Sequence, residues 1–224
     1  MTRLIFCDLD GTLLSSGRDR LPGVVLSEIK RITDKGIYFC IASGRPYSQL
    51  KSLLGEHYRR VVFICLDGAI TMHRDCVLGK HPLSRPEELL GYADAPLFCR
   101  GGETEISAAL PSARITETIN RAGGEVLKIA LHGKKANSDF ARLCYEGGGI
   151  YEYVQNGVDK GTAAKALCEK LRIDPADTAA LGDGENDIPL LRFAGKAFRM
   201  PQSHRALADL GIPVCESEKF LSMF

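Results

Sequence analysis

Two carboxylates stand close together directly after the first apolar segment of the chain. Residues 4–7 read LIFC, and the sequence DLDGT follows them. Side-chain alternation in an extended chain places Asp8 and Asp10 on the same side, and Gly11 permits a sharp turn away from the strand. Crowded carboxylates favour a bound cation, although an ordinary turn also uses Asp and Gly. The motif alone leaves both interpretations open.

A second acidic cluster follows the apolar segment 178–181. The sequence GDGEND at 182–187 places Asp183 directly behind that segment, with Glu185 and Asp187 next. Three acids in so short a stretch indicate metal binding. The dipole of a following helix would also favour Glu185 and Asp187, but it gives no reason for Asp183 at the end of a strand.

A serine and a lysine in two further segments are suited to binding an anion. Ser43 and Gly44 follow the apolar segment 37–42 and precede a proline suited to the first turn of a helix. A hydroxyl and free backbone N–H groups there could bind an anion, or Ser43 could simply cap the helix. Lys160 lies at the start of another helix, where the dipole disfavours a cation unless a phosphate or an acidic cluster is near. A solvated surface lysine is the alternative.

The elements that must position these residues alternate along the chain. Strands are predicted at 4–7, 37–42, 61–66, 178–181, 197–200 and 212–215, and helices at 24–35, 47–54, 162–171 and 188–193. This rhythm predicts an α/β fold with a parallel sheet covered by helices. The last residues are expected to complete the same sheet. Ligands of such sheets bind beyond the carboxyl ends of the strands, so the four polar clusters are expected to meet at one edge.

The middle of the chain departs from this rhythm. Residues 68–83 look like short extended pieces, and a loop-rich region with prolines and a Gly-Gly pair follows. Helices at 113–121 and 138–146 and strands at 126–131 and 150–154, separated by Gly-rich turns, indicate a small α/β insert. We therefore predict a discontinuous core at 1–83 and 156–224, with a second domain at 84–155.

Composition narrows the classes of function. With 45% hydrophobic and 25% charged residues, the chain is typical of a globular protein. The formal charge is +1 and no basic stripe is present, so no nucleic acid partner is expected. No signal-peptide pattern or membrane-length apolar run appears, so no membrane association is expected. The five histidines share no metal-ligand spacing, and the eight cysteines form no C-x-x-C pair. We interpret the cysteines as small buried hydrophobic residues of a cytoplasmic protein.

The four clusters together resemble the ordered motifs of the haloacid dehalogenase (HAD) superfamily. The matching segments are DLDGT at 8–12, SGR at 43–45, DKG at 159–161 and GDGEND at 182–187. The insertion between the second and third motifs, and the wording GDGENDIPLL, are similar to the Cof-type sugar-phosphatase branch. The resemblance implies a Rossmann-like HAD core plus a small α/β cap domain, here shortened to about 70 residues.

The resemblance also implies a reaction. It is the Mg2+-dependent hydrolysis of a small phosphomonoester, a sugar phosphate or a phosphoglycerate-type metabolite, through an aspartyl-phosphate intermediate. Asp8 would attack phosphorus, and Asp10 would protonate the leaving oxygen and later activate water. Residues implied to bind the metal are Asp8, the backbone carbonyl of Asp10, and Asp183, with Asp187 supporting them or orienting Lys160. Residues implied to bind the phosphoryl group are Ser43 and Lys160, with Gly44, Arg45 and Asn186 shaping the same pocket.

Two departures from the family pattern bear on the substrate. Asp67 stands where the Cof-type pattern usually has Asn, so an extra carboxylate is expected to face the pocket. Its negative charge should weaken the binding of an anionic substrate unless Asp67 is turned away, protonated or paired. The shortened cap changes the surface that selects the leaving group. Arg100, Glu103 and Glu105 in this insert either reach the substrate or form a solvated face.

Two other functions stay open at this point. A phosphomannomutase-like phosphotransferase would share core and cap but require a bisphosphate. A non-catalytic phosphate-binding protein on the same fold is disfavoured because Asp8, Asp10, Lys160 and Asp183 are all present. No prediction of an oligomeric state follows from the sequence.

Overall fold

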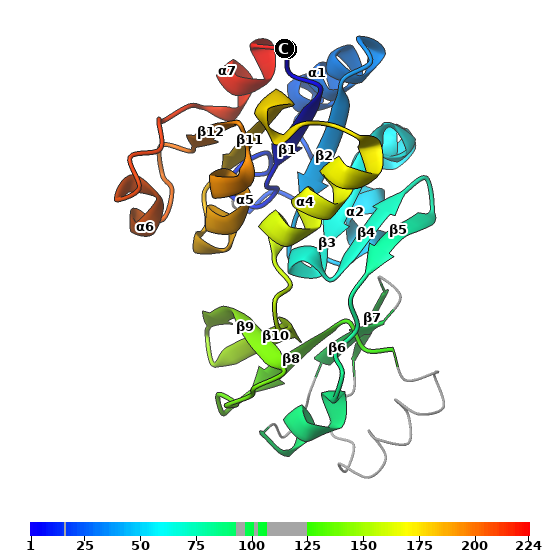
Figure 1. Cartoon of the computed structure of the whole chain (residues 1–224), viewed down its shortest axis with the longest axis vertical. Helices are drawn as coiled ribbons and strands as arrows, with labels where there is room; N and C mark the ends of the chain where they lie inside the picture. The colour runs from blue at the N-terminus through cyan, green and yellow to red at the C-terminus, as the bar shows by residue number, and fades with distance from the viewer. Residues whose placement is uncertain (16, 93–96, 101–102, 107–124) are drawn as a thin grey trace.

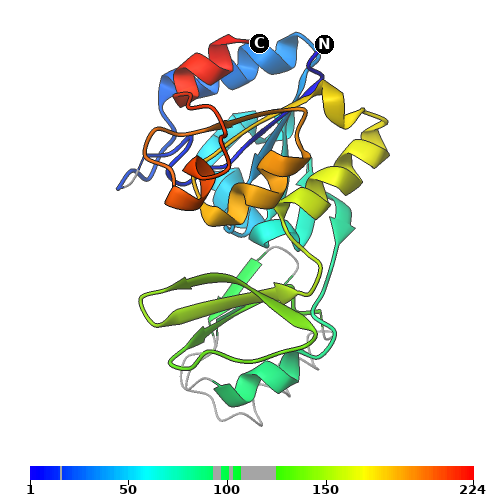
Figure 2. The same ribbon diagram turned by 60° about the vertical axis from the view of Figure 1, so that its left-hand side comes forward.

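The computed structural model describes residues 1–15, 17–92, 97–100, 103–106 and 125–224, which form two β-sheets with flanking helices (Figure 1). The first and last parts of the chain build a large sheet, and the middle part builds a second sheet that lies beside one end of it (Figures 1 and 2). Among the described residues, no helix is both long enough and apolar enough to span a membrane.

The large sheet has the order β12-β11-β1-β2-β3-β4-β5. Its strands are β1 (Leu4–Cys7), β2 (Tyr38–Ala42), β3 (Val61–Cys65), β4 (Ile70–His73), β5 (Cys76–Lys80), β11 (Thr178–Gly182) and β12 (Lys196–Arg199). The pairs from β12 to β3 are parallel, which confirms the predicted α/β core. Strands β4 and β5 add an antiparallel edge, because the short turn after β3 leaves no room for a crossover helix.

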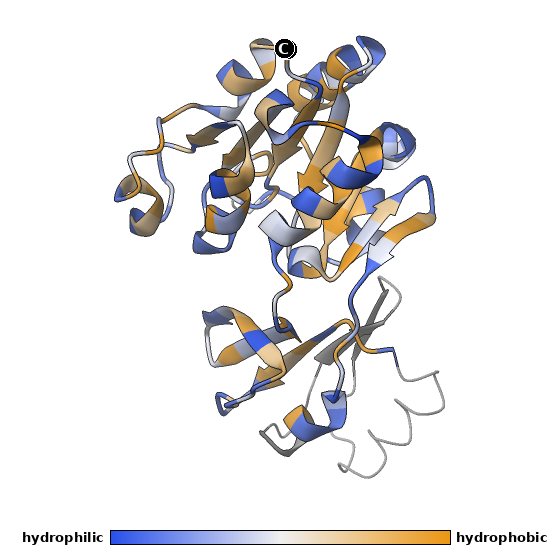
Figure 3. Ribbon diagram, in the orientation of Figure 1, coloured by the Kyte–Doolittle hydropathy of each residue, from blue (hydrophilic) through white to orange (hydrophobic). Residues whose placement is uncertain are grey.

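Helices cover both faces of the large sheet. They are α1 (Gly23–Asp34), α2 (Tyr47–Leu54), α4 (Lys160–Leu171), α5 (Ile188–Phe193), α6 (Arg205–Ala208) and α7 (Ser217–Ser222). Side chains of α1, α2 and α7 pack on one face with Ile5 and Phe39, whereas α4, α5 and α6 pack on the other with Phe6 and Val62. Both faces of the central strands are therefore buried, which explains their continuous apolar sequences (Figure 3).

The second sheet is antiparallel and has the order β7-β6-β8-β10-β9. Its strands are β6 (Leu97–Arg100), β7 (Glu103–Ile106), β8 (Lys128–His132), β9 (Ala141–Gly147) and β10 (Ile150–Gln155). A core of its own includes Leu83, Leu89, Ile129 and Tyr153. The division of the chain at residues 83 and 156 stays a prediction.

The predicted helix at 138–146 is wrong, because residues 141–147 form strand β9. Gly148 and Gly149 both have positive φ and join β9 to β10 in a tight hairpin. A two-residue Gly-Gly turn with this backbone fits the twist of paired strands, so hairpin pairing outweighs the helical preference of the segment. The predicted helix at 113–121 lies outside the described residues.

The end of the chain also differs from the prediction. The expected strand at 212–215 is only an isolated bridge between Arg199 and Val214. The last residues form helix α7 and do not extend the sheet. Phe220 and Leu221 are fully buried, and Arg31 of α1 donates to the Leu221 carbonyl at 3.0 Å. Burial of these apolar side chains against α1 favours the helix over a further strand.

Gly68 holds the end of β3 against the start of α4, and we expect a large loss of stability when it is replaced. Its φ is +104°, and an added Cβ would lie 2.3 Å from the Asp159 carbonyl oxygen. Gly36 also has positive φ, but a Cβ there would meet no atom of the described residues within 4 Å. In urea unfolding, Gly36→Ala should lower the free energy of unfolding by about 1 kcal/mol. Gly68→Ala should lower it by about 2 kcal/mol more because of the clash. Equal losses for the two variants would contradict this packing.

Candidate active site

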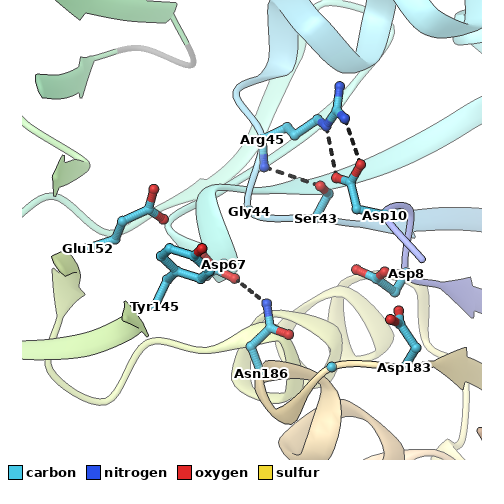
Figure 4. Close-up of a pocket in the computed structure, with 11 residues that line it drawn as sticks. Asp8, Asp10, Ser43, Gly44, Arg45, Asp67, Tyr145, Glu152, Asp183 and Asn186 are labelled. Atoms are coloured by element: carbon cyan, nitrogen blue, oxygen red, sulfur yellow. Dashed lines mark hydrogen bonds and ion pairs between the residues drawn. The ribbon is translucent and has the colours of Figure 1, made fainter. Parts of the chain in front are cut away.

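A cavity of about 360 Å3 lies at the carboxyl ends of β1, β2, β3 and β11, where the large sheet faces the second sheet (Figure 4). The described residues that line it are Asp8, Asp10, Ser43, Gly44, Arg45, Asp67, Tyr145, Glu152, Asp183, Gly184 and Asn186. Residues from three of the four predicted clusters thus line one pocket. The fourth cluster lies beside it, because Lys160 is buried there and binds Asp8. The rule that ligands bind beyond the carboxyl ends of parallel strands accounts for this meeting.

Asp8 lies at the base of the pocket and is paired with a buried lysine. Lys160 is 1% exposed, and its ammonium donates to Asp8 Oδ1 and to Asp187 Oδ1, both at 2.6 Å. Burial alone would lower the pKa of Lys160, but the carboxylates of Asp187 and Asp8 raise it above its ordinary value. The ammonium therefore stays charged, and the interpretation of Lys160 as a solvated surface lysine is wrong.

Three carboxylates at this end of the pocket could hold a metal ion. Oxygen atoms of Asp8, Asp183 and Asp187 all lie within 4.8 Å of one another. Burial, followed by repulsion from Asp187, raises the pKa of Asp8, and burial also raises that of Asp183. When all three are ionised, the one ammonium of Lys160 leaves an excess of two negative charges, and it is this repulsion that a bound cation would relieve. An oxygen-rich site with this charge fits a divalent cation.

Neighbouring groups fix the positions of Asp183 and Asp187. The Thr12 hydroxyl donates to Asp183 Oδ1 at 2.7 Å. Asp187 Oδ2 accepts from the backbone N–H groups of Asp183 and Gly184 at 3.1 and 2.9 Å. Asp187 thus joins the loop after β11 to Lys160. Its role in orienting this lysine for catalysis stays a prediction.

Asp10 lies nearer the mouth of the pocket than Asp8. Both its carboxylate oxygens accept from Arg45, from Nε at 2.8 Å and from Nη2 at 2.6 Å, and its side chain is 50% exposed. Its carboxylate is not part of the three-carboxylate group with Asp8. A contribution of Asp10 to metal binding would therefore come through its backbone carbonyl, as the family resemblance implies.

The turn after β2 forms one wall of the pocket. Ser43 is 1% exposed, and its Oγ accepts from the Arg45 backbone N–H at 3.2 Å. A Cβ on Gly44 would lie 3.1 Å from Asp67 Oδ2, so this position leaves little space for a side chain. Ser43 and Gly44 both line the pocket, so a ligand there would lie beside them.

Asp67 faces the pocket and is paired, one of the possibilities left open by the sequence. Its Oδ2 accepts from Lys128 Nζ at 2.8 Å, and its Oδ1 accepts from Asn186 Nδ2 at 2.9 Å. Burial would raise the pKa of this carboxyl, but Lys128 and Lys160 hold it well below its ordinary value. Asn186 thus contacts Asp67 as well as lining the pocket.

The sequence reasoning missed three residues of the second sheet, namely Lys128, Tyr145 and Glu152. Tyr145 and Glu152 line the pocket on the side of Asp67, opposite Asp8 and Asp183 (Figure 4). Lys128 interrupts the apolar segment 126–131. A lysine in a strand that is otherwise apolar is a signal of a buried, paired charge, and it could have pointed to this residue. The side chains of Arg100, Glu103 and Glu105 lie outside the described part of the chain.

Comparisons with known proteins identify the family of the chain. The sequence pattern of the haloacid dehalogenase-like hydrolases matches residues 5–90 and 112–218. The chain is 26% identical over 238 residues to the 5-amino-6-(5-phospho-D-ribitylamino)uracil phosphatase YbjI of Escherichia coli, covering 92% of this chain and 87% of that protein. It is 29% identical over 207 residues to a phosphoglycolate phosphatase of Methanopyrus kandleri, covering 87% and 82%.

Solved structures show the same fold at lower identity. The HAD phosphatase BT1666 from Bacteroides thetaiotaomicron superposes with a TM-score of 0.81 at 19% identity, covering all of this chain and 94% of that one. The HAD subclass IIB sugar phosphatase BT4131 superposes with a TM-score of 0.80 at 17% identity, covering 99% and 97%. Because the family pattern covers most of the sequence, the chain belongs to the haloacid dehalogenase-like hydrolases.

Proposed function

We propose that this HAD-type phosphatase hydrolyses a small phosphomonoester with Asp8 as a covalent nucleophile and Mg2+ as its cofactor. The observation that carries the proposal is the position of Asp8 at the base of the pocket, bound to the Lys160 ammonium and with an oxygen within 4.8 Å of oxygens of Asp183 and Asp187. A carboxylate beside a fixed cation and a candidate metal site is suited to attack an anionic phosphoryl group.

The reaction would proceed in two displacements. A carboxylate oxygen of Asp8 forms a bond to phosphorus while the bond from phosphorus to the leaving oxygen breaks, and Asp10 gives that oxygen a proton. Asp10 then takes a proton from water, which attacks phosphorus, frees Asp8 and releases inorganic phosphate. The acid role requires a protonated Asp10 near the leaving oxygen, so we expect its ion pair with Arg45 to open when substrate binds.

The remaining residues would bind the phosphoryl group and the metal. Ser43 lines the pocket and Lys160 binds Asp8 beneath it, and both would contact the phosphoryl oxygens, with the Gly44 main chain and the released Arg45 beside them. Asp8, Asp183 and the carbonyl of Asp10 would hold Mg2+, and Asp187 would position the loop of Asp183. Bound Mg2+ would neutralise charge on the transferring phosphoryl group.

The second sheet would serve as the cap that covers the leaving group. It contributes Tyr145 and Glu152 to the pocket, opposite the proposed nucleophile. We expect a sugar phosphate or a phosphoglycerate-type metabolite as substrate, and the names of the relatives, which include a phosphoglycolate phosphatase and a sugar phosphatase, support small phosphorylated metabolites. A cytoplasmic location stays a prediction, in agreement with free thiols at the cysteines that the structure describes.

Phosphate release from sugar phosphates, phosphoglycerates and nucleotides, with Mg2+ or with EDTA, tests the metal requirement. We expect release from at least one class of small phosphomonoester, and we expect EDTA to lower it by at least about 100-fold because the carboxylate repulsion is then uncompensated. Added Mg2+ should restore it. Turnover that appears only when a sugar bisphosphate is supplied would favour the phosphotransferase, and equal release with and without chelator would contradict the metal site.

A further inference from the structure

Lys128 is a buried cation that joins the two sheets. It lies on β8 and is 4% exposed. Its ammonium donates to Asp67 Oδ2 at 2.8 Å and to the Gly44 carbonyl at 3.2 Å, and it pairs with Glu152 Oε2 at 2.5 Å. Two of these three partners belong to the large sheet and its connecting turns, and one belongs to the second sheet. A lysine this deeply buried requires such partners, because an isolated charge in the interior is strongly disfavoured.

Its partner Asp67 is part of the wall of the phosphatase pocket. Asp67 is 2% exposed, lies in the turn after β3 with a φ of 53°, and is fixed from its other side by Asn186. The pocket is also lined by Asp8 and Asp183, so a bare carboxylate at Asp67 would add repulsion toward an anionic substrate. Lys128 itself is absent from the described residues that line the pocket, although both Asp67 and Glu152 line it. Its influence on a ligand would therefore pass through these neighbours.

We propose that Lys128 is a positioning residue that neutralises Asp67 and so permits an anionic phosphoryl group to bind. The affinity for phosphate then depends on the contact between the second sheet and the large sheet. The inference rests on the proposed phosphatase function. Because the neutralising charge comes from β8, separation of the two sheets would withdraw it from Asp67, and the site would bind phosphate well only when the second sheet is in place.

The test compares the variants Lys128→Met, Asp67→Asn and the double variant. Kinetics with p-nitrophenyl phosphate give KM and kcat, and inhibition by inorganic phosphate gives its Ki. We expect Lys128→Met to raise both KM and Ki by at least about tenfold, since like charges in a shared site are costly, with a smaller change in kcat. Asp67→Asn removes the charge that needs compensation, so the double variant should recover KM and Ki to within about threefold of the parent.

Lys135→Met is the matched control. Lys135 also lies in the middle part of the chain and pairs with a glutamate, Glu146, at 2.6 Å, but this pair is about half exposed. We expect its KM and Ki to be unchanged, because exposed pairs of this kind contribute little.

Two results would overturn the proposal. One is a Lys128→Met enzyme with parental KM and Ki. The other is a double variant that binds phosphate as poorly as Lys128→Met, which would mean that Lys128 acts on the ligand independently of Asp67. The double variant removes the fully buried carboxylate of Asp67 and leaves without its partner only Glu152, whose side chain is 26% exposed and can be solvated. It therefore keeps the test decisive even where Lys128→Met fails to fold. Failure of the phosphatase assignment is distinguished by the parent protein, which would then release no phosphate at all.

Discussion

Asp8→Asn is expected to lower kcat for phosphate release by at least about 10,000-fold, because a neutral amide cannot form the bond to phosphorus that both displacements require. The substitution changes the shape of the side chain very little. The amide oxygen of the new side chain can still accept a hydrogen bond from Lys160, so the loop should keep its position. Phosphate release and thermal unfolding should be measured on the same preparations.

A matched control for this variant is Asp209→Asn. Asp209 is an exposed aspartate near the end of the chain, paired only loosely with Arg205 at 4.0 Å. We expect parental kcat from it. Activity of purified Asp8→Asn protein near the parental level would rule out Asp8 as the nucleophile. A thermal transition at the parental temperature would show that a loss of activity is not caused by unfolding.

Asp10→Asn is expected to lower kcat by about 100-fold to 10,000-fold on an alkyl phosphate, the usual contribution of a positioned acid and base. The loss should be smaller for formation of the intermediate from p-nitrophenyl phosphate, whose leaving oxygen needs little protonation. Inhibition by inorganic phosphate should stay within about threefold of the parent, because the proposed role of Asp10 lies in proton transfer. Rapid-mixing measurement of the first turnover with both substrates checks this difference, because kcat also includes the second displacement, in which Asp10 acts as the base.

Arg45→Met separates the chemistry of Asp10 from its ion pair. Arg45 binds both oxygens of Asp10, so its removal breaks the ion pair and keeps the Asp10 carboxyl group. The variant therefore shows how much of the loss of kcat comes from the ion pair itself. We expect a smaller loss of kcat than in Asp10→Asn, since the acid and base group is retained. Equal losses in the two variants, or equal rates for Asp10→Asn and the parent, would contradict the proposed role of Asp10.

The core fold and the meeting of the four motifs could be predicted because local signals agree there. Strands buried on both faces have continuous apolar sequences, and the residue after each strand must lie at the same edge of a parallel sheet. Lys160 was informative because its position in the first turn of a helix is unfavourable without an acidic partner, and the structure supplies two, Asp8 and Asp187.

The missed features depend on contacts between distant segments. Asp67 could be recognised as a departure from the family pattern, but its partner Lys128 lies 61 residues further along the chain. Strand β9 was mistaken for a helix because the Gly148-Gly149 hairpin, and not the preference of residues 138–146, decides its structure. Helix α7 forms where burial against α1 outweighs any tendency to extend the sheet.

Trapping the phosphorylated enzyme tests the central claim most directly. Asp10→Asn protein would be mixed with p-nitrophenyl phosphate and Mg2+, quenched in acid and digested with trypsin, which cleaves after Arg3 and Arg18 to release residues 4–18 as one peptide. The proposed mechanism predicts a phosphoryl group on this peptide that hydroxylamine removes, as it removes acyl phosphates, and none when Asp8 is also replaced by Asn. A phosphoryl group on another peptide, or one that persists without Asp8, would contradict it.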